Sequence, residues 1–317
     1  MRTLLRLAVL YTAFGTAWAQ TTLRVGLFPN VTHAQGLVAK NLSTEGQGWF
    51  EQRLGPGTKI EWFVYNAGPS AMEAIFARSI DFTYVGPSPA VNAYARANGR
   101  DVRIVAGAMR GGEALVVRGD TIRKVEDFRG KTIATPQLGN TQDVECRAWL
   151  INNGIRVTLV GGDARVLPTA NPDILALFQQ GKLDAAWTVE PWVSRLLAEA
   201  GGRIFFEPEN TVTTVLAGRE EFLRANTELA RKFAAAHREL TQWIRDHPEE
   251  AQRRVRDELS VLTRKEIPLA LIQQAWTRLR FDDMISAEPF QSFLDQARLV
   301  GFLRAKIDLS NLIWNPQ

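Results

Sequence analysis

The chain has 317 residues, 45% hydrophobic and 23% charged, which is ordinary for a folded globular protein and excludes a disordered chain. This length exceeds one average domain, so we expect two folded units. The formal charge is +4, and subtracting Arg2 and Arg6 from 38 basic residues leaves 36 against 34 acidic ones, about +2. With no run of Lys or Arg, this balance excludes nucleic-acid binding.

The first residues have the pattern of a signal peptide. Arg2 and Arg6 precede an apolar stretch over 7–17, and Ala17-Trp18-Ala19 fits a small-x-small cleavage site. We expect residues 1–19 to be removed and the protein to be periplasmic; the alternative is an N-terminal helix. Cys146, the one cysteine, lies far from the cleavage site, so we expect neither a lipoprotein nor a disulfide framework.

The first part of the chain alternates predicted strands and helices. Residues 23–28 alternate in polarity and stop at Pro29-Asn30, which is typical of a strand followed by a turn. The same criteria predict a helix over 33–42, a strand over 60–65, a helix over 69–77, a strand over 81–85, a helix over 88–97 and a strand over 102–106. The alternation indicates an α/β fold with a mostly parallel sheet.

The middle of the chain repeats this alternation. Strands are predicted over 114–117, 132–134, 164–167, 184–187 and 204–206, and helices over 141–151, 172–179 and 191–200. Residues 219–303 are predicted to be nearly all helical, with a helix start at 246–250 marked by an early proline and two acids.

A loose internal repeat links the two parts. Pro69 and Pro172 each open a predicted helix, and Asp81 and Asp184 each follow 12 positions later (81 − 69; 184 − 172). At the same offset Tyr84 aligns with Trp187. The alternative to a true repeat is that the match arises by chance or from spacings that strand–helix units have in common. A true repeat would mean two similar lobes whose loops face each other across a cleft.

We therefore expect a two-lobed arrangement. Lobe I would comprise residues 20–109 plus 212–317, and lobe II, over 110–211, would be inserted into it. The crossovers fall near 107–109 and 211–213. Two crossovers make a hinge, and closure around a ligand is the motion such proteins use.

Three short loops, at 66–70, 86–89 and 138–142, combine Gly with a hydroxyl residue where a strand ends and a helix begins, and the first two also contain Pro. The first turn of a helix offers unpaired N–H groups and partial positive charge, and Gly lets a ligand approach closely. The hydroxyls of Ser70, Ser88 and Thr141 could therefore help to bind an anion. Each could instead be a plain N-cap.

Residues 187–192 are the most distinctive segment. Trp187 and Trp192 could wall an apolar tail while Glu190 accepts from an amine or hydroxyl; alternatively, both tryptophans are core and Glu190 is a solvated helix-start acid. In the first loop, His33 could donate to an oxyanion or simply begin a helix. His237 and His247 are expected to be solvated.

The sequence has no catalytic or metal-binding pattern. Gly-x-Ser-x-Gly, the phosphate-binding glycine loop and His-Glu-x-x-His are all absent, and no metal-ligand spacing connects the histidines. Cys146 is expected to pack inside a helix. We therefore expect a binding protein with no cofactor, no metal and no catalytic residue.

Residues 23–39, 85–90, 134–143 and 190–192, including Gly-Asn-Thr-Gln-Asp at 139–143, resemble the nitrate/sulfonate/taurine family of ABC-transporter substrate-binding proteins, and most of all its aliphatic-sulfonate branch. The resemblance implies a type II periplasmic-binding (Venus-flytrap) fold, a monomer, a small anionic ligand in the cleft and an ABC permease of the inner membrane as partner. It implies ligand contacts at Thr32, His33, Gly68, Ser70, Ser88, Asn140, Thr141, Gln142 and Glu190.

We therefore expect high-affinity capture of a sulfonate without chemistry. One alternative is an enzyme on the same fold, resembling pyrimidine-synthesising thiamine-pathway proteins or menaquinone-pathway lyases; the single cysteine and the signal peptide argue against it. A second is a binder of a neutral pyrimidine or aromatic compound stacked on Trp187.

Overall fold

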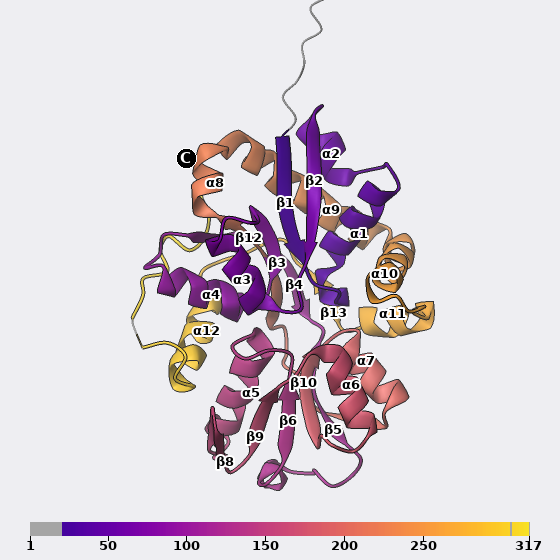
Figure 1. The fold of residues 1–317 in the computed structure, drawn as a ribbon, viewed down its shortest axis with the longest axis vertical. Coiled ribbons are helices and arrows are strands. Elements are labelled where there is room, and N and C mark those ends of the chain that lie inside the picture. Colours follow the sequence, from indigo (N-terminus) through magenta and orange to yellow (C-terminus); the bar gives the residue numbers. More distant parts are fainter. Residues whose placement is uncertain (1–20, 305, 317) are drawn as a thin grey trace, which may run out of the picture.

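The computed structural model describes residues 21–304 and 306–316, which form two lobes, each a sheet with helices on its faces (Figure 1). The predicted signal peptide, residues 1–19, lies outside the described residues. Within the described ranges, no helix combines the length and the apolar character needed to cross a membrane.

The first sheet has six strands. Strands β1, β2 and β3 are parallel, β12 is antiparallel to both β3 and β4, and β13 is antiparallel to β4, so β1 to β4 all point the same way. The sheet is thus mostly parallel with two reversed strands. Its order in space is β13 (Leu279–Phe281), β4 (Val102–Gly111), β12 (Val212–Arg219), β3 (Phe82–Val85), β1 (Thr21–Leu27) and β2 (Thr58–Val64).

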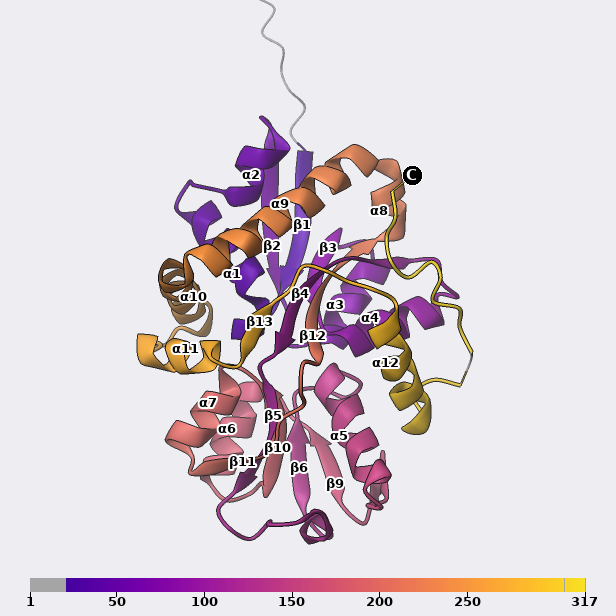
Figure 2. The same cartoon turned by 180° about the vertical axis from the view of Figure 1, so that it is seen from behind.

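Two helical layers enclose this sheet, and their apolar side chains form two separate core clusters. Figure 2 shows the long α9 crossing one face. On that face lie α1 (Ala34–Thr44), α2 (Trp49–Leu54), α9 (Thr227–Asp246), α10 (Pro248–Thr263) and α11 (Leu269–Trp276). On the other lie α3 (Gly68–Phe76), α4 (Pro87–Arg96) and α12 (Glu288–Leu299), while the short α8 (Glu220–Ala225) follows β12.

The second sheet has five strands, and β5 alone runs against the others. Its order is β11 (Gly202–Phe206), β5 (Glu113–Arg118), β10 (Ala185–Val189), β6 (Thr132–Thr135) and β9 (Arg165–Pro168). Around it lie α5 (Thr141–Asn152), α6 (Asn171–Gln179), α7 (Trp192–Glu199), a 3₁₀ turn η2 (Val125–Phe128) and the small hairpin of β7 (Val157–Thr158) and β8 (Gly161–Gly162).

The two sheets share one topology, which supports the internal repeat. The order β2-β1-β3-β12-β4 in the first corresponds to β9-β6-β10-β5-β11 in the second. The aligned aspartates play the same part: Asp81 accepts from the backbone N–H of Arg24 at 3.0 Å, and Asp184 accepts from that of Thr132 at 2.9 Å. Strands β3 and β10 are thus each tied at their start to a neighbouring strand, β1 and β6 respectively.

The chain passes from the first sheet to the second between β4 and β5, and returns between β11 and β12. Gly111 and Gly112, at φ 69° and 74°, form the first passage in a backbone region that favours glycine. A Cβ on Gly112 would lie 2.4 Å from Leu279 Cδ2, so the crossing is also crowded. We propose lobe boundaries at 109/110 and 211/212, with the first hinge at these two glycines.

The sequence missed three elements of this lobe and misplaced one histidine. Helix α2 and strand β12 were not predicted, and strand β13 lies in the stretch 219–303 that was expected to be nearly all helical. His237 is fully buried rather than solvated, because α9 presents it to the sheet. There its Nδ1 meets Tyr84 Oη at 3.0 Å and its Nε2 meets the Gly107 carbonyl at 2.8 Å. Burial lowers its pKa to about 4.

The paired aspartates give a matched stability test. Asp81 is almost fully buried and also pairs with Arg24 at 2.7 Å and Arg219 at 2.8 Å, whereas the Asp184 side chain is 27% exposed. Asp81→Ala should lower the free energy of unfolding by about 3 kcal/mol, because it leaves Arg24 without its carboxylate and removes one of the two carboxylates that pair with Arg219. Asp184→Ala should cost about 1 kcal/mol. Urea denaturation measures both; equal losses would contradict this explanation.

Candidate functional site

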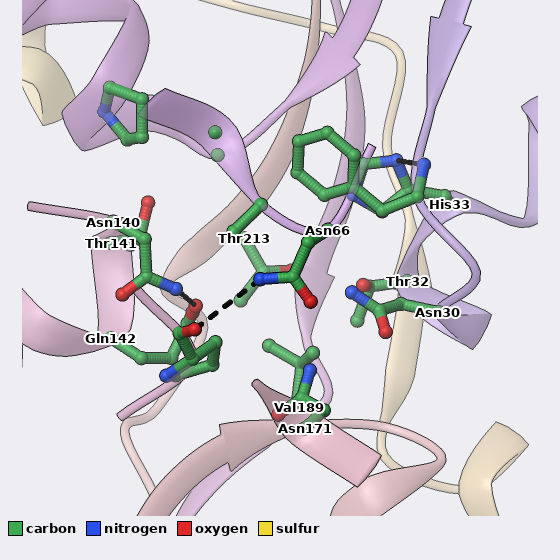
Figure 3. A pocket seen from close by; sticks show the side chains of 16 residues that line it. Asn30, Thr32, His33, Asn66, Asn140, Thr141, Gln142, Asn171, Val189 and Thr213 are labelled. Carbon is green, nitrogen blue, oxygen red and sulfur yellow. Dashed lines mark hydrogen bonds between the residues drawn. The ribbon is translucent and has the colours of Figure 1, made fainter. Parts of the chain in front are cut away.

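A small cavity lies between the lobes, where the carboxyl ends of strands from both sheets meet (Figure 3). Its volume is about 20 Å³ over the positions open to the centre of a water molecule, so in this closed form it is little larger than one water. From the first lobe it is lined by Phe28, Asn30, Thr32, His33, Asn66, Ala67, Gly68, Gly86, Pro89 and Thr213. From the second it is lined by Pro136, Asn140, Thr141, Gln142, Asn171 and Val189.

Several helices begin at this cavity. The first residues of α3, α5 and α6 are Gly68, Thr141 and Asn171, and all three line it. Helix α4 begins at Pro87, next to the lining residue Gly86. The first-turn N–H groups of a helix lack partners within the helix and carry partial positive charge. Helix starts from both lobes therefore favour an anion at one point.

Among the described residues, the lining contains no Asp, Glu, Lys or Arg. His33 lines the cavity, and burial lowers the pKa of its ring to about 3, so the ring is neutral at physiological pH. Its Nδ1 accepts from the backbone N–H of Phe28 at 3.3 Å, which places the proton of the neutral ring on Nε2. The imidazole can thus act as an uncharged hydrogen-bond donor.

A chain of hydrogen bonds orients the amides on the α5 side. Asn140 Oδ1 accepts from the backbone N–H of Asp143 at 2.9 Å and so caps α5. Its Nδ2 donates to Gln142 Oε1 at 3.1 Å, and Gln142 Nε2 donates to Glu113 Oε2 at 2.6 Å. Because the chain ends on a carboxylate acceptor, both amide oxygens are used as acceptors within the chain and both amide nitrogens as donors. Each amide nitrogen keeps a second hydrogen that this chain does not use.

Behind Gln142 lies a buried pair of carboxyl groups. Glu113 is fully buried, Glu145 is 6% exposed, and their side chains lie within hydrogen-bonding reach of each other. Burial raises the pKa of Glu113, and burial together with the charge of Glu113 raises the pKa of Glu145 well above its usual value. The two groups therefore share a proton, which avoids two adjacent buried negative charges.

This pair predicts a pH dependence of stability. Above about pH 4.5 an unfolded Glu145 releases its proton while the folded one keeps it, so stability falls as pH rises, at most about 1.4 kcal/mol per unit, up to the folded pKa. Glu145→Gln removes this titration and should gain stability relative to the wild type between pH 5 and 8. Urea titrations at several pH values measure it. If stability depends on pH in the same way for the wild type and for Glu145→Gln, the folded protein does not hold a proton on Glu145.

Most of the expected ligand residues meet at the cavity. Thr32, His33, Gly68, Asn140, Thr141 and Gln142 all line it. Ser88 lies beside it: its N–H donates to Thr141 Oγ1 across the lobes at 3.3 Å, and its buried Oγ has no partner among residues 21–304 and 306–316. Ser70 does not line it, because its hydroxyl turns back to the Ala67 carbonyl at 2.8 Å in the first turn of α3.

In the segment with the two tryptophans, residues 187–192, Val189 lines the cavity but Trp187, Glu190 and Trp192 do not. Trp187 is core of the second lobe, with its ring 6.2 Å from that of Trp149 and 5.7 Å from that of Phe206. Its expected role as a cleft wall is therefore wrong. Trp192 bridges the lobes, because its Nε1 donates to Asn30 Oδ1 at 3.0 Å.

Glu190 is a contact between the lobes. It is fully buried, so the alternative of a solvated acid is wrong, and it does not line the cavity. Its carboxylate accepts from Ser194 N–H and Oγ–H, both at 3.0 Å, and from Arg278 of the first lobe at 3.1 Å. Burial raises its pKa, and these partners oppose the rise. Its backbone carbonyl also accepts from Val31 N–H at 2.9 Å.

Four polar lining residues were not assigned from the sequence: Asn30, Asn66, Asn171 and Thr213. The three asparagines follow strand ends or open a helix, which is a usable signal at the carboxyl edge of a sheet. No sequence signal pointed to Thr213, because strand β12 was not predicted from the sequence. Across the described ranges no group of His, Cys, Asp and Glu is arranged to hold a metal ion.

A model of the NMT1-like family matches residues 17–257, well over half of the sequence. The chain belongs to this family. The taurine-binding periplasmic protein of Escherichia coli (strain K12) is 28% identical over 184 residues, 56% of this chain and 55% of that protein. A putative aliphatic sulfonates-binding protein of Bacillus subtilis (strain 168) is 23% identical over 238 residues, 72% of this chain and 67% of that protein. The chain thus spans about half to two thirds of these curated relatives.

Solved structures agree on the fold. The alkanesulfonate-binding protein SsuA from Xanthomonas axonopodis pv. citri, bound to MOPS, has a TM-score of 0.76 at 21% identity, covering 94% of this chain and 99% of that one. The periplasmic nitrate-binding protein NrtA from Synechocystis PCC 6803 has a TM-score of 0.74 at 15% identity, covering 90% and 83%. The family resemblance and the two-lobed periplasmic-binding-protein fold expected from the sequence are confirmed.

Proposed function

We propose that the chain is the extracytoplasmic solute-binding component of an ABC importer and captures a small organic anion, a sulfonate such as an alkanesulfonate or taurine, between its lobes. The supporting observation is the convergence of helix starts from both lobes on a cavity lined by neutral donors and no acid. The names of the taurine- and sulfonate-binding relatives point to the same class of ligand. A periplasmic, monomeric protein that delivers to a membrane permease fits this role.

The expected interactions with an anion are strong enough for micromolar affinity. A helix terminus contributes about 0.3–2 kcal/mol toward an anion, and each hydrogen bond to a charged group contributes about 1.5–3 kcal/mol. Micromolar affinity needs about 8 kcal/mol. Three helix starts together with a few donors such as Asn140 and Thr141 reach this value without a cationic side chain.

Binding would be coupled to lobe closure. In the closed form the lobes are joined by Val31 with Glu190, Trp192 with Asn30, Ser88 with Thr141 and Arg278 with Glu190. The cavity within this closure is little larger than a water molecule, so a sulfonate group enters an opened form and settles as the lobes adjust around it. The closed surface is then what a permease would recognise.

The rival functions have less support. An enzyme would need an activated nucleophile or an effective acid or base at the cavity. The lining residues in the described ranges include no carboxyl, thiol or amine group, and burial lowers the pKa of His33 to about 3, which makes this ring a weak base. A binder of a neutral aromatic compound stacked on Trp187 is disfavoured, because that ring packs in the core of the second lobe.

Removing one donor tests the proposal against a matched control. Thr141→Val keeps the shape but removes the hydroxyl at the cavity, and it should weaken sulfonate binding about tenfold or more, the value of one hydrogen bond to a charge. Ser70→Ala removes a similar hydroxyl that faces Ala67 instead and should change affinity less than about twofold. Calorimetry of the purified protein with methanesulfonate, taurine, nitrate and sulfate gives both values. No binding across this panel would refute the anion proposal.

A second test concerns closure. Arg278→Met leaves the buried Glu190 carboxylate without its cation from the other lobe and so disfavours the closed form. Affinity should fall about tenfold, since a bias of about 1.4 kcal/mol against the competent state lowers apparent affinity by that factor. Arg245→Met, which breaks the pair with Asp283 inside the first lobe at 3.0 Å, is the control. Calorimetry with small-angle scattering measures binding and closure; equal effects of the two variants would contradict the coupling.

A further inference from the structure

A groove that the proposed function has not used adjoins the cavity. The groove has a volume of about 320 Å³ and shares Asn30, Asn66 and Asn171 with the cavity lining. It runs outward between α6 and α7 of the second lobe and the end of α10 of the first. The three shared asparagines form the boundary past which a ligand with its head in the cavity would extend its remaining atoms.

The walls of the groove are largely apolar. Trp192 from α7, Leu175 from α6 and Leu262 from α10 face it, together with two prolines. Trp192 is held in place by its hydrogen bond to Asn30, so the indole forms a fixed surface at the junction with the cavity. A hydrocarbon chain or a ring would be buried against these side chains.

The charges at the groove are of one sign. Arg195 and Lys265 line it, and no Asp or Glu is among its lining residues in the described ranges. Arg195 is paired with Glu199 through two bonds of 2.7 and 3.0 Å. Lys265 is exposed, and no ion pair of its side chain is recorded within residues 21–304 and 306–316. Among the charged side chains that line the groove in the described ranges, a terminal ammonium would meet only cations.

The cleft has another opening, which fits a tail less well. That opening, about 370 Å³, shares only Pro89 with the cavity lining and carries the opposite charges of Glu73 and Arg96. Leu138, 45% exposed, lies at its edge. The shared asparagines make the groove beside Trp192 the more direct continuation.

We propose that this groove receives the tail of the captured anion, and that it selects sulfonates whose tail is apolar and ends in an uncharged or acidic group over those that end in ammonium. The inference rests on the proposed function, since it assumes an anionic head in the cavity. It makes longer alkanesulfonates, arenesulfonates and sulfonated carboxylates better ligands than taurine.

A chain-length series tests the groove. Each methylene that enters it should raise affinity about three- to fourfold. Calorimetry with methane-, ethane-, butane- and hexanesulfonate should therefore show a steady rise that stops when the groove is full. Leu262→Ser should flatten the rise while leaving methanesulfonate affinity unchanged. Leu138→Ser, the matched change at the other opening, should leave the series unaltered.

A second set of ligands tests the charge preference. Pentanesulfonate, 5-sulfopentanoate and 4-aminobutanesulfonate carry the same four methylenes and differ at the end. The ammonium compound should bind weakest, and Lys265→Glu should narrow the gap between it and the carboxylate about two- to fivefold, as expected for an exposed charge. Lys232→Glu, at an exposed site on α9, makes the same change of charge away from the groove and should leave the gap intact.

The outcomes separate the two proposals. If methanesulfonate does not bind, the proposed function fails and the groove inference falls with it. If methanesulfonate binds but affinity is flat with chain length, or if Leu138→Ser flattens the series in place of Leu262→Ser, the groove inference alone is wrong. A preference for the ammonium compound would overturn the charge selection. Thermal melts of each variant show that the fold is retained.

Discussion

The direction of two strands, β5 and β12, determines that the candidate binding site lies between the lobes. Strands β5 and β12 carry the chain across between the lobes, and each runs against its neighbours in its sheet. As a result, the other long strands of both sheets end at the gap between the lobes. The helices that follow these strands must then begin there. Positive helix starts are thus gathered by topology, before any side chain is chosen.

In the proposed function the same loops serve both binding and closure. Asn30 and Thr141 line the cavity, yet each also bonds across the lobes, to Trp192 and to Ser88 respectively. Both use their oxygens as acceptors in these contacts. The Thr141 hydroxyl hydrogen and the Asn30 amide hydrogens remain able to donate to an anion. Closure therefore orients the donors that the ligand needs, and a ligand that accepts from them stabilises the closed form.

The sequence predicted the fold well because its signals are local and repeated. Strand ends followed by Gly-Pro or Gly-Asn-Thr located α3, α4 and α5, and the equal spacing of Asp81 and Asp184 indicated two similar lobes. Six of the expected ligand residues line the cavity for the same reason, since a helix start at the carboxyl edge of a sheet has little freedom in where it lies.

The errors concern side-chain direction, which local sequence does not specify. All five residues of β10 are buried, so no alternation of polarity shows which face Trp187 takes. Ser70 and Thr141 both stand in first turns, but a shift of two positions turns the Ser70 hydroxyl back onto Ala67. The Glu190 contact with Arg278 joins residues 88 positions apart, and only the tertiary fold brings them together.

A buried acid behind the proposed anion site would oppose binding through its charge, but its position has an advantage. Glu113 accepts from Gln142, which in turn accepts from Asn140, so the carboxylate fixes which atom of each amide donates and which accepts. The amide dipoles of Gln142 and Asn140 partly screen a bound anion from the charge of the Glu113 carboxylate. The proton shared with Glu145 keeps the pair at a single negative charge. A neutral acceptor could orient Gln142 less firmly, since hydrogen bonds to a charged group are the stronger ones. As a consequence, the stability of the fold depends on the proton shared by Glu113 and Glu145. The orientation of Gln142 and Asn140 thus depends on a carboxyl pair that does not line the cavity.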